Sequence, residues 1–226
     1  MQRFEDREHA GRVLAERLRP RFGGRRDVLV LALPRGGVPV GYEVAMALGA
    51  PLDVFLVRKL GVPGHEELAM GAIAGGGVRV MNRSVLSMID VPQREIDRVA
   101  RREGVELERR AEAYRGTRGE PVVRGRTVIL VDDGLATGST MRAAAAALKA
   151  LGPKEVVVAV PVAARETCDE LAEEVDEVIC VRTPEPFHAV GLWYDDFSQT
   201  TDDEVRELLD AARAARPSGP SESPAS

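Results

Sequence analysis

Short apolar runs alternate along the chain with amphipathic stretches, and this alternation predicts the fold. Five runs are rich in β-branched residues and carry few polar side chains, which is typical of strands buried in a parallel sheet. They cover residues 27–33, 52–58, 126–131, 155–162 and 177–181. Apolar positions recur at helical spacing in residues 38–49, 139–152 and 165–174. Strands that alternate with helices predict an α/β fold with right-handed crossovers.

Other segments depart from this alternation. Residues 4–18 have helical spacing with Asp6 as a suitable N-cap, and residues 92–115 predict a long charged helix. The glycine-rich residues 69–82 indicate a short hairpin or a mobile loop. Aromatic residues gather in 183–201 before a short helix over 202–215, and the low-complexity end cannot bury enough surface to order itself. We therefore predict one domain over residues 1–215 and a disordered tail over 216–226.

Composition limits the class of protein. Apolar residues make up 44% of the chain and charged residues 30%, as in ordinary globular proteins. A net charge of −5 argues against a general nucleic-acid or membrane surface, since both need a basic excess. No apolar run approaches the ~20 residues of a membrane helix, and the N-terminus lacks a signal-peptide core. We expect a cytoplasmic protein without nucleic-acid or membrane partners.

The cysteines and histidines form no recognisable metal motif. Cys168 and Cys180 lie in a predicted helix and a predicted strand, without the nearby companions of a zinc site. We expect both to be buried, reduced thiols. The stretch HEELA places Ala69 where a zincin has its second histidine.

The run VILVDDGLATGST, residues 128–140, joins a buried strand to two acids and a glycine-punctuated run of hydroxyl side chains. Asp132 and Asp133 follow the strand at its carboxyl end, where open α/β sheets bind ligands. A Walker B strand also ends in acids, but its partner loop, GxxxxGKS or GxxxxGKT, is absent. A dinucleotide fingerprint fails too, because LPRGGVPVG lacks a glycine at position 38.

This run suits a phosphorylated sugar. Three hydroxyl side chains and a flexible glycine precede the unsatisfied N–H groups of a helix N-terminus, which attract a phosphate. The two aspartates suit the paired hydroxyls of a sugar, or a magnesium ion. The simpler alternative is an acidic strand end followed by a serine cap.

The same run closely resembles the 5-phosphoribosyl 1-diphosphate (PRPP) motif of type I phosphoribosyltransferases, and PRGGVPV and VRKLGVPGHEELAMGA are also similar to stretches of a bacterial subgroup. The likeness extends over about residues 1–210. It implies a three-layer, Rossmann-like parallel sheet with a small hood made by the N-terminal helix and residues about 183–200. It also places residues 61–82 where that family has a flexible loop over the reacting centre.

The resemblance assigns roles to individual residues. Asp132 and Asp133 would contact the ribose hydroxyls, and Arg58 and Lys59 would add positive charge near the diphosphate. Arg35, with forked donors, would bind the diphosphate and assist catalysis together with Lys59 and the two acids. The residues implied in PRPP binding are Pro34, Arg35, Gly36, Gly37, Arg58, Lys59, Asp132, Asp133, Ala136, Thr137, Gly138, Ser139 and Thr140. The alternatives are an ordinary turn with an exposed arginine at 34–37 and a solvated surface pair at 58–59.

The segment FHAVGLWYDDF has some likeness to the 6-oxopurine branch of that family. On that alignment Phe187, Trp193 and Tyr194 are candidates for acceptor binding, and Asp195 would join Asp132 and Asp133 near Mg²⁺. An extra residue follows Phe187, and the strand at 155–162 lacks the lysine that this branch directs at the purine. Purine specificity is therefore not implied, and the aromatic residues could equally form the core of a small hood.

The function implied by the resemblance is Mg²⁺-dependent transfer of 5-phosphoribosyl from PRPP to an unidentified, nucleobase-like small molecule, with release of diphosphate. Two alternatives keep the same site. One is a non-catalytic protein that senses PRPP, and the other is a hydrolase or phosphorylase of a ribosyl phosphate. Family precedent favours a homodimer.

Overall fold

A computed structural model describes residues 2–215, so the predicted tail lies outside the described residues. The main sheet is parallel, with the strand order β2-β1-β6-β7-β8. Its strands are β1 (Val28–Ala32), β2 (Leu52–Val54), β6 (Thr127–Val131), β7 (Glu155–Val162) and β8 (Glu177–Arg182). The α/β prediction is therefore confirmed, and the apolar runs form the strands because both faces of the sheet are covered.

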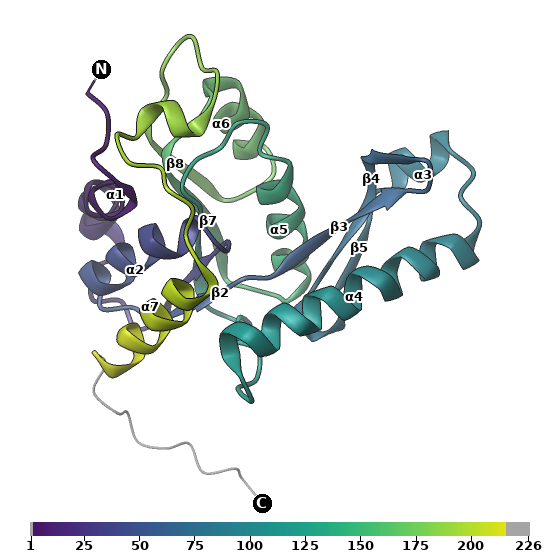
Figure 1. The fold of residues 1–226 in the computed structure, drawn as a ribbon, viewed down its shortest axis with the longest axis horizontal. Coiled ribbons are helices and arrows are strands. Elements are labelled where there is room, and N and C mark those ends of the chain that lie inside the picture. Colours follow the sequence, from purple (N-terminus) through teal and green to yellow (C-terminus); the bar gives the residue numbers. More distant parts are fainter. Residues whose placement is uncertain (1, 216–226) are drawn as a thin grey trace, which may run out of the picture.

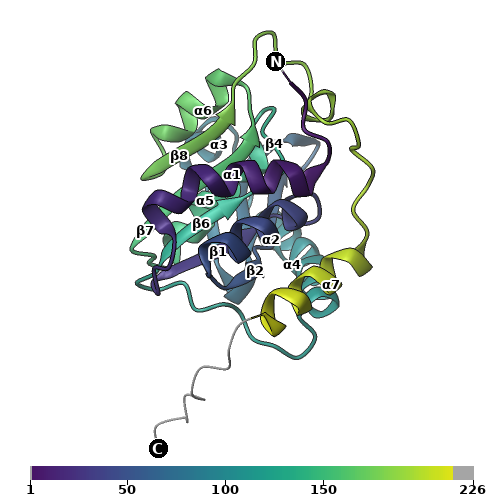
Figure 2. The ribbon, with the colours of Figure 1, turned by 90° about the vertical axis from the view of Figure 1, so that its left-hand side faces the viewer.

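Helices form a layer on each side of this sheet (Figures 1 and 2). Alternate residues of β6 serve the two layers: Ile129 and Val131 pack with the helices on one face, whereas Val128 and Leu130 pack with those on the other. The first layer holds α1 (Arg7–Phe22), α2 (Gly37–Leu48) and α7 (Asp202–Ala214), and the second holds α5 (Ser139–Ala150) and α6 (Arg165–Ala172). Within residues 2–215, no helix is long and apolar enough to cross a membrane.

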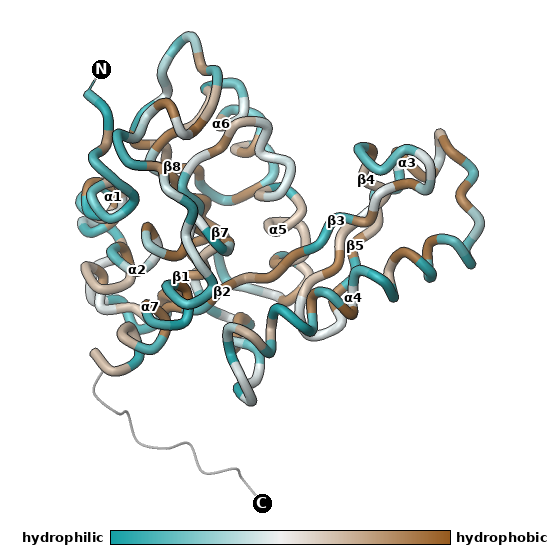
Figure 3. Tube along the Cα trace, in the orientation of Figure 1, coloured by the Kyte–Doolittle hydropathy of each residue, from teal (hydrophilic) through white to brown (hydrophobic). Residues whose placement is uncertain are grey.

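An arm projects from this core (Figure 1). It contains a three-stranded antiparallel sheet of β3 (Val57–Val62), β4 (His65–Ala74) and β5 (Arg79–Met81), with η1 (Gly75–Gly77) between the last two. The helices α3 (Arg83–Met88) and α4 (Gln93–Arg115) follow. Hydrophobic and hydrophilic residues alternate along α4 (Figure 3), as expected for a helix that buries one face, here with Ile96, Val99 and Leu107.

Two local predictions need correction. The predicted strand over residues 52–58 is divided between β2 in the main sheet and β3 in the arm, because the buried Phe55 and Leu56 connect two different sheets. The hairpin option for residues 69–82 is confirmed, since β4 pairs with β5. Cys168 and Cys180 are not buried, reduced thiols: both are only partly buried, and they form a disulfide because the fold places α6 beside the edge strand β8.

Residues 183–200, called the hood segment below, lie over the carboxyl end of the main sheet. The hood segment contains η2 (Val190–Trp193) and forms a bridge between Tyr194 and Phe4, which precedes α1. These two aromatic residues form a small separate core with Ala10 and Val162. Helix α1 itself packs along α2 and the main sheet (Figure 2).

Candidate functional site

The two acids lie at the carboxyl end of β6, directly against the loop between β1 and α2. A Cβ atom added to Gly36 would lie 2.1 Å from Asp133 Oδ2, and one added to Gly37 would lie 2.8 Å from the carbonyl oxygen of Val131 and 3.2 Å from Asp132 Oδ1. A larger residue would displace the Asp133 side chain at the first position and would clash with the backbone of residues 131–132 at the second. The peptide bond between Pro34 and Arg35 is cis. The fold thus joins the acidic pair to the loop for which the sequence predicts diphosphate binding.

Burial perturbs both carboxyl groups. It raises the pKa of Asp132 well above its usual range, and the neighbouring charge of Asp133 raises it further. Burial also raises the pKa of Asp133, but the Arg7 guanidinium opposes this shift. Two adjacent buried acids of this kind need a cation or hydroxyl donors to remain ionised.

Arg7 is part of this site, although no feature of the sequence singled it out. Its Nε donates a hydrogen bond to Asp133 Oδ2 at 2.9 Å, and the two side chains are 12% and 15% exposed. Its Nη1 donates to the carbonyl oxygen of Ser198 at 2.6 Å, and its Cζ lies 4.0 Å from the centre of the Phe197 ring. In the sequence Arg7 is one arginine among many at the start of a helix, and its partner lies 126 residues away.

The predicted phosphate loop leads into α5 with its donors exposed. Gly138 adopts a left-handed conformation (φ 65°) as the N-cap of α5, and no side chain caps the helix. Thr137, Ser139 and Thr140 are exposed to solvent, so their hydroxyls and the first helical N–H groups are open to an anion. The Thr167 hydroxyl of α6 supports the loop by donating to the carbonyl oxygen of Ala136 at 2.6 Å.

The predicted cations reach different parts of the site. Lys59 was expected near the diphosphate, but its Nζ donates to Ser139 Oγ at 3.3 Å, so it lies beside the phosphate loop. Arg58 forms an ion pair with Glu103 of α4 at 2.7 Å. Arg35, 36% exposed, lies 4.0 Å from Asp202 Oδ1.

A small cavity borders one residue of each predicted anion loop, Pro34 and Thr140. Its volume is about 40 Å³, and its lining includes Pro34, Arg58, Thr140 and Arg110 of α4. This volume has room for no more than a few waters, so a phosphoryl group would have to widen it. Arg110 was not predicted from the sequence, because there it is one residue of a charged helix face.

The aromatic candidates for acceptor binding differ in their surroundings. Tyr194 is 3% exposed, and its hydroxyl donates to the carbonyl oxygen of Asp133 at 2.5 Å, so it fastens the hood segment. Trp193 is partly buried, and its Nε1 has no hydrogen-bond partner within residues 2–215. Phe187 is partly buried too and lines a cavity of about 390 Å³ with Pro184 and residues 164–166.

Asp195, the third predicted metal ligand, is not gathered with the other two acids. Its side chain is 64% exposed and lies 3.9 Å from Arg3 Nη1. In the part of the chain that the structure describes, no three metal-ligating side chains form a group. The carboxylate donors at the strand end are therefore Asp132 and Asp133.

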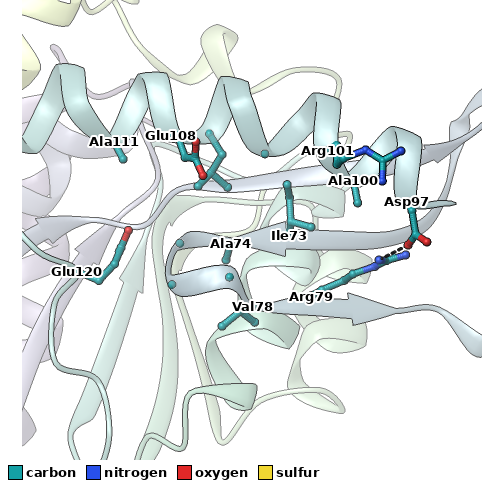
Figure 4. Close-up of a pocket in the computed structure, with 15 residues that line it drawn as sticks. Ile73, Ala74, Val78, Arg79, Asp97, Ala100, Arg101, Glu108, Ala111 and Glu120 are labelled. Carbon is teal, nitrogen blue, oxygen red and sulfur yellow. Dashed lines mark hydrogen bonds and ion pairs between the residues drawn. The ribbon is translucent and has the colours of Figure 1, made fainter. Parts of the chain in front are cut away.

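A separate cavity of about 400 Å³ lies on the arm between the β4–β5 hairpin and α4 (Figure 4). Its lining includes apolar residues, among them Ile73 and Ala100, and charged ones such as Glu108 and Glu120. Arg79 and Asp97 pair across its rim at 2.9 Å. None of its lining residues belongs to the strand-end loops, so this cavity is distinct from the acidic pair.

Comparisons with known proteins agree on one family. A family model described as "Phosphoribosyl transferase domain" matches residues 3–192. Two curated proteins from strains of Mycobacterium tuberculosis, "Putative phosphoribosyl transferase MT0597" and "Putative phosphoribosyl transferase Rv0571c", are each 49% identical over 212 residues, which is 94% of this chain and 47% of the relative. The chain thus spans about half the length of these curated relatives.

Two further comparisons give a shorter relative and a solved structure. "Bifunctional protein PyrR" of Chloroflexus aurantiacus is 33% identical over 143 residues, which is 62% of this chain and 72% of PyrR. The crystal structure of TT1426 from Thermus thermophilus is 47% identical with a TM-score of 0.84, and the match covers 92% of this chain and 98% of TT1426.

Proposed function

The chain belongs to the phosphoribosyl transferase family, and on that premise we propose that it transfers 5-phosphoribosyl from PRPP to a small-molecule acceptor. The main sheet and the helices on its two faces form the three-layer, Rossmann-like architecture of the family's type I fold. The observation that carries the proposal is the contact of Asp132 and Asp133 with Gly36 and Gly37. It brings two acids suited to the ribose hydroxyls next to a loop suited to the diphosphate leaving group.

In the proposed reaction, the C1–O bond to diphosphate breaks, a bond from the acceptor to C1 forms, and the proton that the acceptor loses passes to diphosphate or water. Diphosphate leaves with the bonding electron pair, so C1 develops positive charge. The protein's task is then mainly positioning and charge stabilisation. The backbone of residues 34–37 and Arg35 would hold the diphosphate, and residues 136–140 with Lys59 would hold the 5-phosphate. Asp132 and Asp133 would accept hydrogen bonds from the ribose hydroxyls.

The residues present fit a magnesium ion. Mg²⁺ prefers carboxylate oxygens and usually takes one or two of them together with waters and substrate phosphates. Asp132 and Asp133 offer such oxygens beside the proposed diphosphate loop. Because Arg7 already occupies Asp133 Oδ2, Asp132 is the better ligand. When bound, Mg²⁺ would neutralise charge on the leaving diphosphate.

The test combines turnover with product identity. Purified protein with PRPP, Mg²⁺ and a panel of nucleobases should release diphosphate, and mass spectrometry should find the base joined to ribose 5-phosphate. Asp132→Asn and Asp133→Asn should suppress both signals, whereas Asp210→Asn, at an exposed position, should not. Ribose 5-phosphate without a joined base would instead show hydrolysis. Binding of PRPP without any product would show a sensor.

A further inference from the structure

Arg7 joins three parts of the molecule around the proposed donor site. It contacts Asp133 through Nε and the hood segment through the carbonyl oxygen of Ser198 and the ring of Phe197. A Cβ atom added to Gly36 would lie 3.3 Å from Arg7 Nε, so the guanidinium also borders the proposed diphosphate loop. One side chain therefore contacts the sugar-binding acid, the leaving-group loop and the hood segment.

A second contact joins the hood segment to Asp133. The Tyr194 hydroxyl bonds to the Asp133 backbone, and the Tyr194 and Phe197 rings pack with centroids 5.0 Å apart. Phe197 in turn covers Arg7. The Asp133 side chain is therefore linked to residues 194–198 by a continuous series of contacts through Arg7 and Phe197.

Arg7 Nε already occupies Oδ2, one of the two acceptor oxygens that Asp133 offers to a ribose hydroxyl. A charge-assisted hydrogen bond between largely buried partners is strong and directional, so a new donor that reaches Oδ2 must share this oxygen with the guanidinium or displace it. We propose that Arg7 is a positioning residue that couples the hood segment to occupancy of the donor site. This inference rests on the proposed function, because it takes PRPP as the ligand at Asp133.

The chain supplies its own reporter for this coupling. Trp193 is the single tryptophan, and its carbonyl oxygen accepts a hydrogen bond from the Phe4 N–H within the hood's small core. Its fluorescence therefore reports on the hood segment without a label. Arg12→Gln is a matched control, because Arg12 lies on the same helix, is 52% exposed and pairs with Glu8 and Glu43 away from the acids.

The first measurement uses the protein without ligand. Arg7→Gln should raise acrylamide quenching of Trp193 by about twofold, because the hood segment loses its contacts with Arg7 and opens more often. Arg7→Lys, which keeps the charge but lacks the forked donors, should give an intermediate value. Arg12→Gln should match the wild type. If circular dichroism shows that Arg7→Gln is folded and its Trp193 is quenched as in the wild type, Arg7 does not hold the hood segment in place.

The second measurement adds PRPP with Mg²⁺ and records binding heat and Trp193 emission together. Wild-type emission should change on saturation, and Arg7→Gln should bind about tenfold more weakly with most of that change lost at saturation. PRPP binding with an equal emission change in Arg7→Gln, or with none in the wild type, would overturn the coupling. If PRPP gives no binding heat in the wild type, the assignment of PRPP to this site fails. The quenching experiment still tests whether Arg7 holds the hood segment in place.

Discussion

The contact between Gly36 and Asp133 gives a sharp prediction, because Gly36→Ala adds one methyl group at the centre of the site. Gly36 has ordinary helical angles (φ −60°, ψ −31°), so alanine causes no backbone strain there. The new Cβ would lie 2.1 Å from Asp133 Oδ2, 2.8 Å from its Cγ and 3.3 Å from Arg7 Nε. The carboxylate would have to withdraw by roughly 1 Å or more to reach even a short ordinary contact.

The magnitude follows from what that movement disturbs. Overpacking a filled site costs about 1–3 kcal/mol, and complete loss of a partner from a buried ion pair costs about 3–5 kcal/mol. Because the Arg7 pair is displaced rather than removed, we expect the free energy of unfolding to fall by about 1–3 kcal/mol. PRPP binding should weaken at least about tenfold, since the acid would no longer face the sugar.

The assay is urea unfolding combined with calorimetric titration of PRPP in Mg²⁺. Gly104→Ala is the control, because the nearest atom to its Cβ is 4.0 Å away and the residue lies within α4. That change should stabilise the protein by about 0.5–1 kcal/mol and leave PRPP binding unaltered. The stability losses of Gly36→Ala and Asp133→Ala should be less than additive in the double variant, because without the carboxylate the new methyl group has nothing to displace. Wild-type stability and affinity in Gly36→Ala would refute the proposed packing of the site.

Three further predictions concern other parts of the chain. Arg115 is 2% exposed and pairs with the largely buried Asp53 of β2, so Arg115→Ala should lower the free energy of unfolding in urea by about 3–5 kcal/mol. Arg118→Ala, at a site 43% exposed, should change it by less than about 1 kcal/mol. Burial and then the hydrogen bond to Asp202 raise the pKa of Tyr114 to about 12. The folded protein therefore keeps a proton that the unfolded chain loses near pH 10, and stability should fall toward pH 12 by up to about 1.4 kcal/mol per pH unit. Urea unfolding at pH 9–11.5 should show this loss, and Tyr114→Phe should remove it. Cys168→Ala should lower the free energy of unfolding by about 2–4 kcal/mol, and its urea midpoint should equal that of the reduced wild type. A midpoint equal to that of the oxidised wild type would show that the disulfide does not stabilise the protein.

Local patterns in the sequence were sufficient to predict the main sheet. The apolar runs ending at residues 131 and 162 predicted buried strands, because their residue types favour strands and both faces lack polar side chains. The acids after β6 and the glycines after β1 were then placed at one edge by the parallel arrangement alone. The placement of these two loops at one edge of the sheet could therefore be predicted from the sequence, whereas their contact depends on β1 and β6 being neighbouring strands.

Contacts between distant segments could not be predicted in this way. The run at 52–58 has the composition of one strand, and only the position of the arm decides that it divides after Val54. The disulfide was missed because the proximity of α6 and β8 is a tertiary property. Arg7 was missed for the same reason: an arginine in the first turn of an amphipathic helix carries no local sign of a partner 126 residues away.

The most direct test of the proposed donor site is a crystal structure of the protein with PRPP and Mg²⁺. We expect the 5-phosphate at residues 136–140, the diphosphate at residues 34–37, and the ribose hydroxyls on Asp132 and Asp133. PRPP bound elsewhere, for example in the arm cavity between η1 and α4, would contradict the proposal, as would absence of PRPP from the strand-end site at saturating concentration.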